Sequence, residues 1–216
     1  MKKNIFLLLI IFFSIKAEAK KDIYPLTLIA AKADLIVIGE IDVVKGNTYI
    51  FKISENLKGQ KFKTITVKMF QEWDCDPRWE KPKKGQKLCL FLTKDQNVWE
   101  IINGSSGEMF ISGNLIYLGG EDSMKIVNNE ITRNDMSLTE FKNTIKDFCS
   151  CYSFVGKLGY RNYDKPHYIL QTCSDRQIAE FEKRSKFSTK LFEEMKSYNV
   201  IKLLNHLNFL LTPSNF

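Results

Sequence analysis

The sequence predicts a mainly β protein with added α-helices: a small closed barrel of five strands, extended by hairpins and followed by a helical C-terminal region. Two observations support this prediction. Between residues 33 and 102, apolar runs about one strand long follow one another and are separated by turn residues. After about residue 135, the apolar residues recur instead at the three-to-four-residue spacing of amphipathic helices.

The N-terminal segment, residues 1–19, has the pattern of a secretory signal peptide. Two lysines precede the apolar run Ile5–Phe13, and Ala17-Glu18-Ala19 fits the small-x-small rule of a cleavage site. The run is too short to cross a bilayer, which takes about 20 apolar residues. We therefore expect cleavage before Lys20, a secreted or periplasmic mature protein, and no transmembrane segment after cleavage.

The first expected elements are a short helix and a bent strand. Pro25–Lys32 suits a helix because proline fits the first helical turn. The strand that follows is apolar on both faces over Leu35–Ile38 and alternates after Gly39. A glycine at such a change of pattern often marks a bulge. We therefore expect this strand to belong to both sides of the barrel.

The later strands of the barrel follow from alternating or continuous apolar runs. Glycine, asparagine and aspartate between the runs are typical turn residues. Residues 71–86 contain two prolines and a glycine and are expected to form a long loop. The predicted strands are Tyr49–Ile53, Phe62–Met69, Leu88–Leu92 and Val98–Ile102.

Two hairpins are expected after the barrel because each has glycine or asparagine at its centre, where a tight turn needs positive φ. They extend the β part to about residue 134. The first joins Glu108–Ile111 to Leu115–Leu118, and the second joins Met124–Val127 to Glu130–Thr132.

Residues 135–216 are expected to be helical. Ser137 and Glu140 form a capping box before an apolar helical stripe that runs from Leu138 to Tyr152. A second helical region covers 174–198, and a third helix is expected over 200–211. The mature chain therefore divides into a barrel with its hairpins, 20–134, and a helical region, 135–216.

Three segments together resemble a known domain family: Ala33–Gly39, Phe51–Gly59 and Gly85–Leu92, in this order. They are similar to the netrin-like, or tissue inhibitor of metalloproteinases-like, domain in the version found in many uncharacterised exported bacterial proteins. The resemblance covers Leu28 to Asn103. It implies a five-stranded OB-like Greek-key barrel, an architecture that binds proteins, oligosaccharides or nucleic acids through one face.

The sequence departs from the family where its inhibitors act. In those proteins an N-terminal cysteine presents its α-amine and carbonyl to a catalytic zinc, whereas the expected mature chain begins Lys20-Lys21-Asp22. The inhibitory mechanism therefore does not carry over, and no functional residue is transferred from the family.

The charge pattern argues against a nucleic-acid partner. The formal net charge is +7, but lysines alternate with acidic residues along the chain instead of gathering in one stripe.

The cysteines are expected to form disulfides because the protein is expected to be exported. We predict a bridge between Cys151 and Cys173. Cys149 lies at the centre of the apolar stripe of its helix and is expected to be buried, whereas Cys151 lies on the flank near the helix end and Cys173 precedes the next helix cap. The pairing of Cys75, Cys89 and Cys149 is left open.

The candidate binding site is the loop Trp73–Trp79, because its residue types exceed what a loop requires. Tryptophan and arginine are typical anchors of protein interfaces, and tryptophan also stacks on sugar rings. The alternative is that the tryptophans cover the barrel end and Cys75 ties the loop down, which the length of the loop favours. The candidate residues are Trp73, Asp74, Asp76, Arg78 and Trp79.

No pattern in the sequence indicates catalysis, a metal or a cofactor. His167 and His206 lack metal-ligand spacing, and Gly104–Gly107 lacks the lysine of a phosphate-binding loop and is expected to be a connection. The leading hypothesis is a non-enzymatic module that binds an exported or envelope protein through the barrel rim. The alternatives are an oligosaccharide-binding module and an enzyme whose site the sequence does not reveal.

Overall fold

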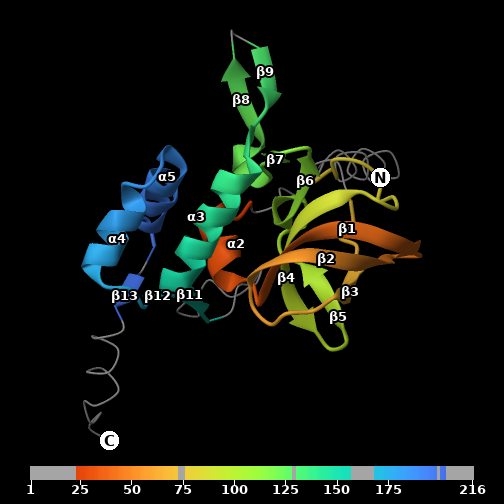
Figure 1. The fold of residues 1–216 in the computed structure, drawn as a ribbon, viewed down its shortest axis with the longest axis horizontal. Helices are drawn as coiled ribbons and strands as arrows, with labels where there is room; N and C mark the ends of the chain where they lie inside the picture. The colour runs from red at the N-terminus through yellow and green to blue at the C-terminus, as the bar shows by residue number, and fades with distance from the viewer. Residues whose placement is uncertain (1–22, 73–75, 128–129, 157–167, 199, 203–216) are drawn as a thin grey trace, which may run out of the picture.

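The structure is a computed structural model that describes residues 23–72, 76–127, 130–156, 168–198 and 200–202. Its described part is mainly β with α, as the sequence predicts. A closed barrel lies beside a layer of helices, and a long β-ribbon projects from the body (Figure 1).

The barrel closes by pairing its first strand with two others. The strand order is β1-β2-β3-β5-β4, and β4 pairs back with β1. All neighbours are antiparallel except β3 and β5, so the barrel is a mixed, OB-like Greek key. Its strands are β1 (Leu35–Lys45), β2 (Thr48–Lys58), β3 (Thr64–Lys68), β4 (Lys87–Asp95) and β5 (Val98–Ile101).

The expected irregularity at Gly39 is confirmed. The register between β1 and β2 shifts between Ile38 and Gly39, where β1 turns from one side of the barrel to the other. A Cβ atom added to Gly39 would lie 2.1 Å from the carbonyl oxygen of Lys52 and 2.9 Å from the ring of Phe51. The position therefore requires glycine because the neighbouring backbone fills the space of a side chain.

We predict that Gly39→Ala lowers the free energy of unfolding by about 3 kcal/mol, the upper range for overpacking against backbone. Urea denaturation measures the loss. Gly113→Asn is the matched control, because Gly113 has a φ of +57° with open space around it, and asparagine tolerates this conformation. Equal losses in the two variants would contradict the close-packing argument.

Strands β1 and β4 are buried on both faces because they separate two apolar cores. Leu35 and Val37 point into the barrel, whereas Ile36 and Ile38 belong to the core shared with the helices. In β4, Leu88, Leu90 and Leu92 lie in the barrel core, and Cys89 and Phe91 face the helices. This two-sided burial explains why both segments are continuous apolar runs.

The helices pack on the outer side of β1 and β4 and share one core with them (Figure 1). The C-terminal region is therefore not separated from the barrel by its own core. Of the described helices, none is long and apolar enough to span a membrane. The helices are α2 (Leu26–Lys32), α3 (Leu138–Cys151), α4 (Asp175–Glu182) and α5 (Lys186–Met195).

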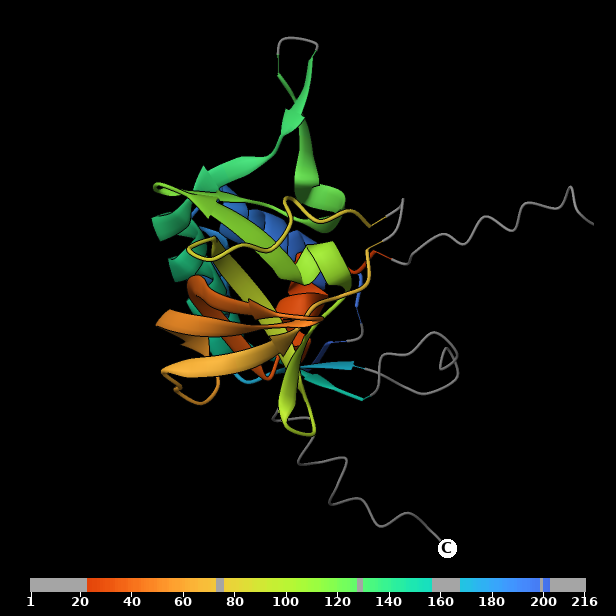
Figure 2. The ribbon, with the colours of Figure 1, turned by 90° about the vertical axis from the view of Figure 1, so that its right-hand side faces the viewer.

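Both expected hairpins are confirmed and form one interrupted ribbon. β6 (Glu108–Ser112) pairs with β4 and β7 (Leu115–Tyr117), and β7 pairs with β10 (Asp135–Ser137). Beyond them β8 (Met124–Val127) and β9 (Glu130–Arg133) pair only with each other. Figure 2 shows this second hairpin standing clear of the body. Two short 3₁₀ helices, η1 (Gly104–Gly107) and η2 (Gly120–Ser123), lie at its base.

Two helix predictions for the C-terminal region are wrong at their ends. Tyr152 does not continue α3 but begins β11 (Tyr152–Val155), which pairs with β12 (Tyr168–Gln171). Val200–Lys202 is not helical but forms β13, parallel to β12. Its β-branched residues Val200 and Ile201 suit a strand once a sheet edge is available. The rest of the expected third helix lies outside the described residues.

Cys151 and Cys173 form the pair expected from the sequence, with their sulfur atoms 2.05 Å apart. Cys149 is half-buried rather than buried, and its thiol lies 3.7 Å from the carbonyl oxygen of Ala30. Cys89 is a buried free thiol, and Cys75 lies outside the described residues.

We predict that Cys151→Ser together with Cys173→Ser lowers the free energy of unfolding by about 3 kcal/mol, because the bridge closes a loop over 22 positions. Cys149→Ser, which keeps a hydrogen-bonding group at Ala30, should change it far less. Denaturation curves compare the variants. A Cys149–Cys173 linkage in non-reducing peptide maps would contradict the pairing.

Candidate functional site

The candidate loop between β3 and β4 reaches from the barrel to η1 and β6. Trp73 and Asp74 lie outside the described residues. The other three predicted residues are described, and two of them point inward instead of presenting a binding surface. Asp76 is 4% exposed, and its Oδ1 accepts a hydrogen bond of 3.1 Å from the backbone N–H of Ser105. Asp76 therefore ties the loop to η1.

Arg78 anchors the loop to the barrel through a buried ion pair. Its side chain is 4% exposed, and its Nε donates to Oε1 of Glu108 at 2.5 Å, while Nη1 donates to Glu72 at 2.9 Å. The guanidinium also lies 3.8 Å from the ring centre of Phe70. The second carboxylate oxygen of Glu108 accepts from the hydroxyl of Tyr49 at 3.1 Å. The side chain of Arg78 is thus buried in ion pairs and is not exposed to solvent.

The electrostatics of this cluster depend on the positive charge of Arg78. Burial raises the pKa of the Glu108 carboxyl above its ordinary value, and Arg78 opposes that rise. Burial, followed by the nearby charge of Glu108, raises the pKa of Tyr49 well above its ordinary value. An ionised Glu108 in this position therefore needs the guanidinium beside it.

We predict that Arg78→Met destabilises the protein by about 3 kcal/mol at pH 7 and by less at pH 5. Without the guanidinium the pKa of Glu108 rises further, so the folded state retains a proton that the unfolded state releases above its ordinary pKa of 4.5. Stability relative to the wild type then falls as the pH rises from the pKa that Glu108 has in the folded wild type towards the higher pKa that it has in the variant.

Denaturation at the two pH values measures this difference. The variant Arg78→Met/Glu108→Gln should be more stable at pH 7 than Arg78→Met alone, because no unpaired charge is left buried. Equal losses at both pH values, or no recovery in the double variant, would contradict the role of the ion pair.

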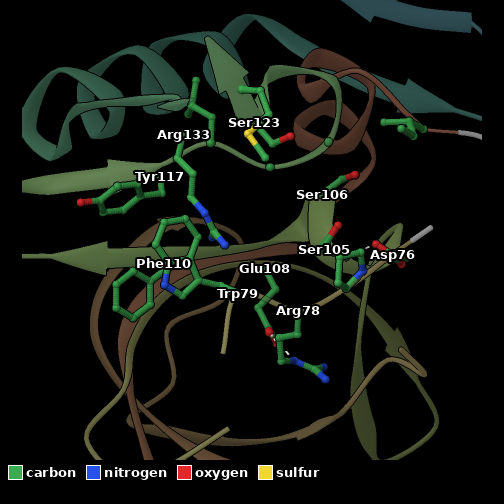
Figure 3. Close-up of a pocket in the computed structure, with 16 residues that line it drawn as sticks. Asp76, Arg78, Trp79, Ser105, Ser106, Glu108, Phe110, Tyr117, Ser123 and Arg133 are labelled. Carbon is green, nitrogen blue, oxygen red and sulfur yellow. Dashed lines mark hydrogen bonds and ion pairs between the residues drawn. The ribbon is translucent and has the colours of Figure 1, made fainter. Parts of the chain in front are cut away.

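Trp79 lies in a cluster of side chains from three strands (Figure 3). Its ring stacks on Phe110, with centroids 5.1 Å apart and planes 8° from parallel, and lies 4.5 Å from the ring of Tyr117. The guanidinium carbon of Arg133 is 3.4 Å from the centre of the Trp79 ring. Arg133 is exposed, and none of the described residues forms an ion pair or hydrogen bond with its side chain. Trp79 therefore positions an arginine that has no acidic partner within the described chain.

A cavity of about 280 Å³ opens beside this cluster, and we name it the Trp79 pocket. Figure 3 shows Arg133 extending into the space between the aromatic side chains and η1. Aromatic side chains, a methionine, hydroxyl groups and charged side chains line it. The lining includes Trp79, Phe110, Tyr117, Met124, Ser105, Ser106 and Ser123, and the charged residues Asp76, Arg78, Glu108 and Arg133.

The floor of the pocket is made where η1 and η2 meet. A Cβ atom on Gly119 would lie 2.5 Å from the carbonyl oxygen of Ser105, so only glycine permits this approach. Ser106 is 2% exposed, and its Oγ has no hydrogen-bond partner among the described residues. A buried hydroxyl without a partner indicates a place for a water or a ligand oxygen.

The hairpin β8–β9 continues the wall of the pocket outward. Met124 and Arg133 are paired across it and both line the pocket, and Ile126 and Ile131 are paired two positions farther out on the same face. Met124 is 56% exposed, and Ile126 and Ile131 are each 75% exposed. We name these four residues the hairpin face. It is an apolar surface that leads into the pocket.

Most of this site was not predictable from the sequence. Trp79 and the hairpin strands were expected, but Phe110, Tyr117 and Arg133 were not expected as neighbours of the tryptophan. The available signal was the pair Ile126 and Ile131. An isolated two-stranded hairpin does not need large apolar side chains at both of these positions.

The sequence matches no protein-family model, and the comparison with curated proteins found no match. Among the described residues, no group of three or more histidine, cysteine, aspartate or glutamate side chains is placed to hold a metal ion.

Proposed function

We propose that this protein is an exported, non-enzymatic binding module that holds a protein partner on the hairpin face and in the Trp79 pocket. The observation that carries the proposal is the exposure of three large apolar side chains on one face of a projecting hairpin. Contiguous exposed apolar surface rimmed by polar residues is typical of interaction sites.

The hairpin itself supports the need for a partner. β8 and β9 pair only with each other, so their outer edges have no partner strand among the described residues. A two-stranded hairpin is marginally stable in water, and an apolar face on it is stabilised when another surface covers it. An extended segment that lies along the hairpin would bury the apolar side chains and complete the backbone hydrogen bonds.

The size of the surface indicates that the partner also enters the pocket. Burying an isoleucine or methionine side chain contributes about 1.5–3 kcal/mol. At about 25 cal/mol per Å², this energy corresponds to roughly 60–120 Å² of apolar surface removed from water. Three such side chains provide less than half of the roughly 800 Å² that each partner of a specific interface buries. The hairpin face alone is therefore too small, and the adjoining pocket supplies the remaining contact.

The oligosaccharide alternative is less well supported. A sugar binds tryptophan by lying flat on its ring, but the ring of Trp79 already stacks on Phe110 and carries the guanidinium of Arg133 at 3.4 Å. Stacking on Trp79 would have to displace a cation–π contact.

Export forms part of the proposal. The pattern of residues 1–19 and the bonded pair Cys151–Cys173 both support an oxidising compartment outside the cytoplasm. The OB-like strand order supports the resemblance to netrin-like domains, from which we take a binding role and not the inhibition of a zinc enzyme.

Photo-crosslinking in the intact cell tests the proposal. A benzoylphenylalanine at Ile126 should give an adduct with one exported protein, whose mass identifies it, and the mature chain should begin at Lys20. With that partner purified, Ile126→Lys should weaken binding at least tenfold, because a charge replaces a buried apolar contact.

Val127 provides the matched control, since it is the next residue, is 43% exposed, and faces the other side of the hairpin. The probe at Val127 should give no adduct, and Val127→Lys should leave the affinity unchanged. The proposal fails if both positions crosslink equally or neither does, or if the hairpin face binds glycans or lipid vesicles instead of protein.

A further inference from the structure

Arg133 is the charged group within an otherwise apolar surface. The other charged residue near it on β8, Lys125, points to the opposite face and pairs with Asp135 at 2.5 Å. Arg133 has no such partner among the described residues, and the contact with Trp79 holds it at the mouth of the pocket. The aromatic contact therefore keeps an arginine in place whose hydrogen-bond donors have no acceptor among the described residues.

We infer that the Trp79 pocket recognises a carboxylate carried by an extended apolar segment of the protein partner, with the carboxylate on Arg133 and an adjacent apolar side chain against the aromatic wall. This inference rests on the proposed function and names the chemistry of the partner. A planar guanidinium held in one place pairs with a carboxylate through two parallel hydrogen bonds.

The walls of the pocket specify what accompanies the carboxylate. Phe110, Tyr117 and Met124 supply apolar lining against which one large side chain can pack. A volume of about 280 Å³ is just below the range of sites that enclose a whole drug-sized molecule, so the pocket suits a single residue of a longer segment. The buried hydroxyl of Ser106 adds a donor for an oxygen of the ligand, directly or through a water.

An extended segment is favoured by the geometry beside the pocket. The apolar residues of the hairpin face recur every second position, as Met124 and Ile126 do on β8, which matches the side-chain period of a strand lying against it. The carboxylate would then be the end of the segment or an acidic side chain within it. Both sources offer the same group to Arg133, and the experiment separates them.

Three synthetic peptides test the inference with the mature protein. The first is acetyl-Thr-Val-Thr-Ile-Thr-Phe with a free terminal carboxylate, the second is its carboxamide, and the third is the carboxamide with glutamate in place of the last threonine. Isothermal titration gives the affinities. We expect the first or the third peptide to bind at least about tenfold more tightly than the plain carboxamide, and which of the two does so identifies the source of the carboxylate.

Variants of Arg133 assign the preference to this residue. Arg133→Gln should abolish the preference for the carboxylate, and Arg133→Lys should retain part of it, because lysine keeps the charge without the planar fork. Lys125→Gln, on the opposite face of β8, is the matched control and should leave the preference unchanged. Circular dichroism and thermal unfolding establish that each variant is folded.

Three results would overturn the inference. These are equal affinities for all three peptides, a preference that survives Arg133→Gln, and no binding of any peptide at millimolar concentration. If the three peptides bind with equal affinity and Ile126→Lys weakens that binding, the proposed protein-binding function stands and only the inference of carboxylate recognition is removed. Loss of the face-specific crosslink would instead remove the proposed function itself.

Discussion

The fold depends on burying β1 and β4 on both of their faces. Leu35 and Val37 fill the barrel while Ile36 and Ile38 meet the helices, and β4 alternates in the same way. Apolar burial is the main favourable contribution to folding, and these two paired strands contribute it to both cores at once. Because β4 also pairs with β5 and β6, the barrel, the ribbon and the helical layer all take their positions from this pair. The bulge at Gly39 lets β1 change register while it stays paired with both β2 and β4.

The candidate site is held in place by charges buried in its own wall. Arg78 links the long loop to Glu108 on β6, and through Glu108 to the hydroxyl of Tyr49 inside the barrel. Since Trp79 follows Arg78 directly, the ion pair fixes where the indole ring lies. The ring in turn positions Arg133. Arg78, a candidate binding residue in the sequence, therefore acts by positioning Trp79. The exposed arginine that can meet a ligand is Arg133, on the hairpin.

The surface combines a rigid part with a projecting part. The pocket is built on barrel strands and two short 3₁₀ helices, whereas the hairpin face extends from it into solvent. Such a surface suits a protein segment better than a small molecule, because the pocket supplies one specific contact and the hairpin supplies length. A binding role also agrees with an OB-like barrel, an architecture that presents one face and its loops to ligands. The described residues that line the pocket are aromatic and aliphatic side chains, hydroxyls, the buried pair Arg78 and Glu108, the buried Asp76, and Arg133.

Local sequence determined much of the fold, because strand patterns, turns and caps act over a few residues. The continuous apolar runs at Leu35–Ile38 and Leu88–Leu92, the bulge at Gly39 and the paired strands of both hairpins were all predictable. So was the pairing of Cys151 with Cys173, from the helix face and the next cap. Tertiary structure decided the rest. Tyr152 and Val200 became strand residues because a sheet edge lay beside them, and Trp79 met Arg133 because packing brings the base of the hairpin β8–β9 beside the loop. Contacts between distant segments depend on packing and buried charge, which the pattern of neighbouring residues does not contain.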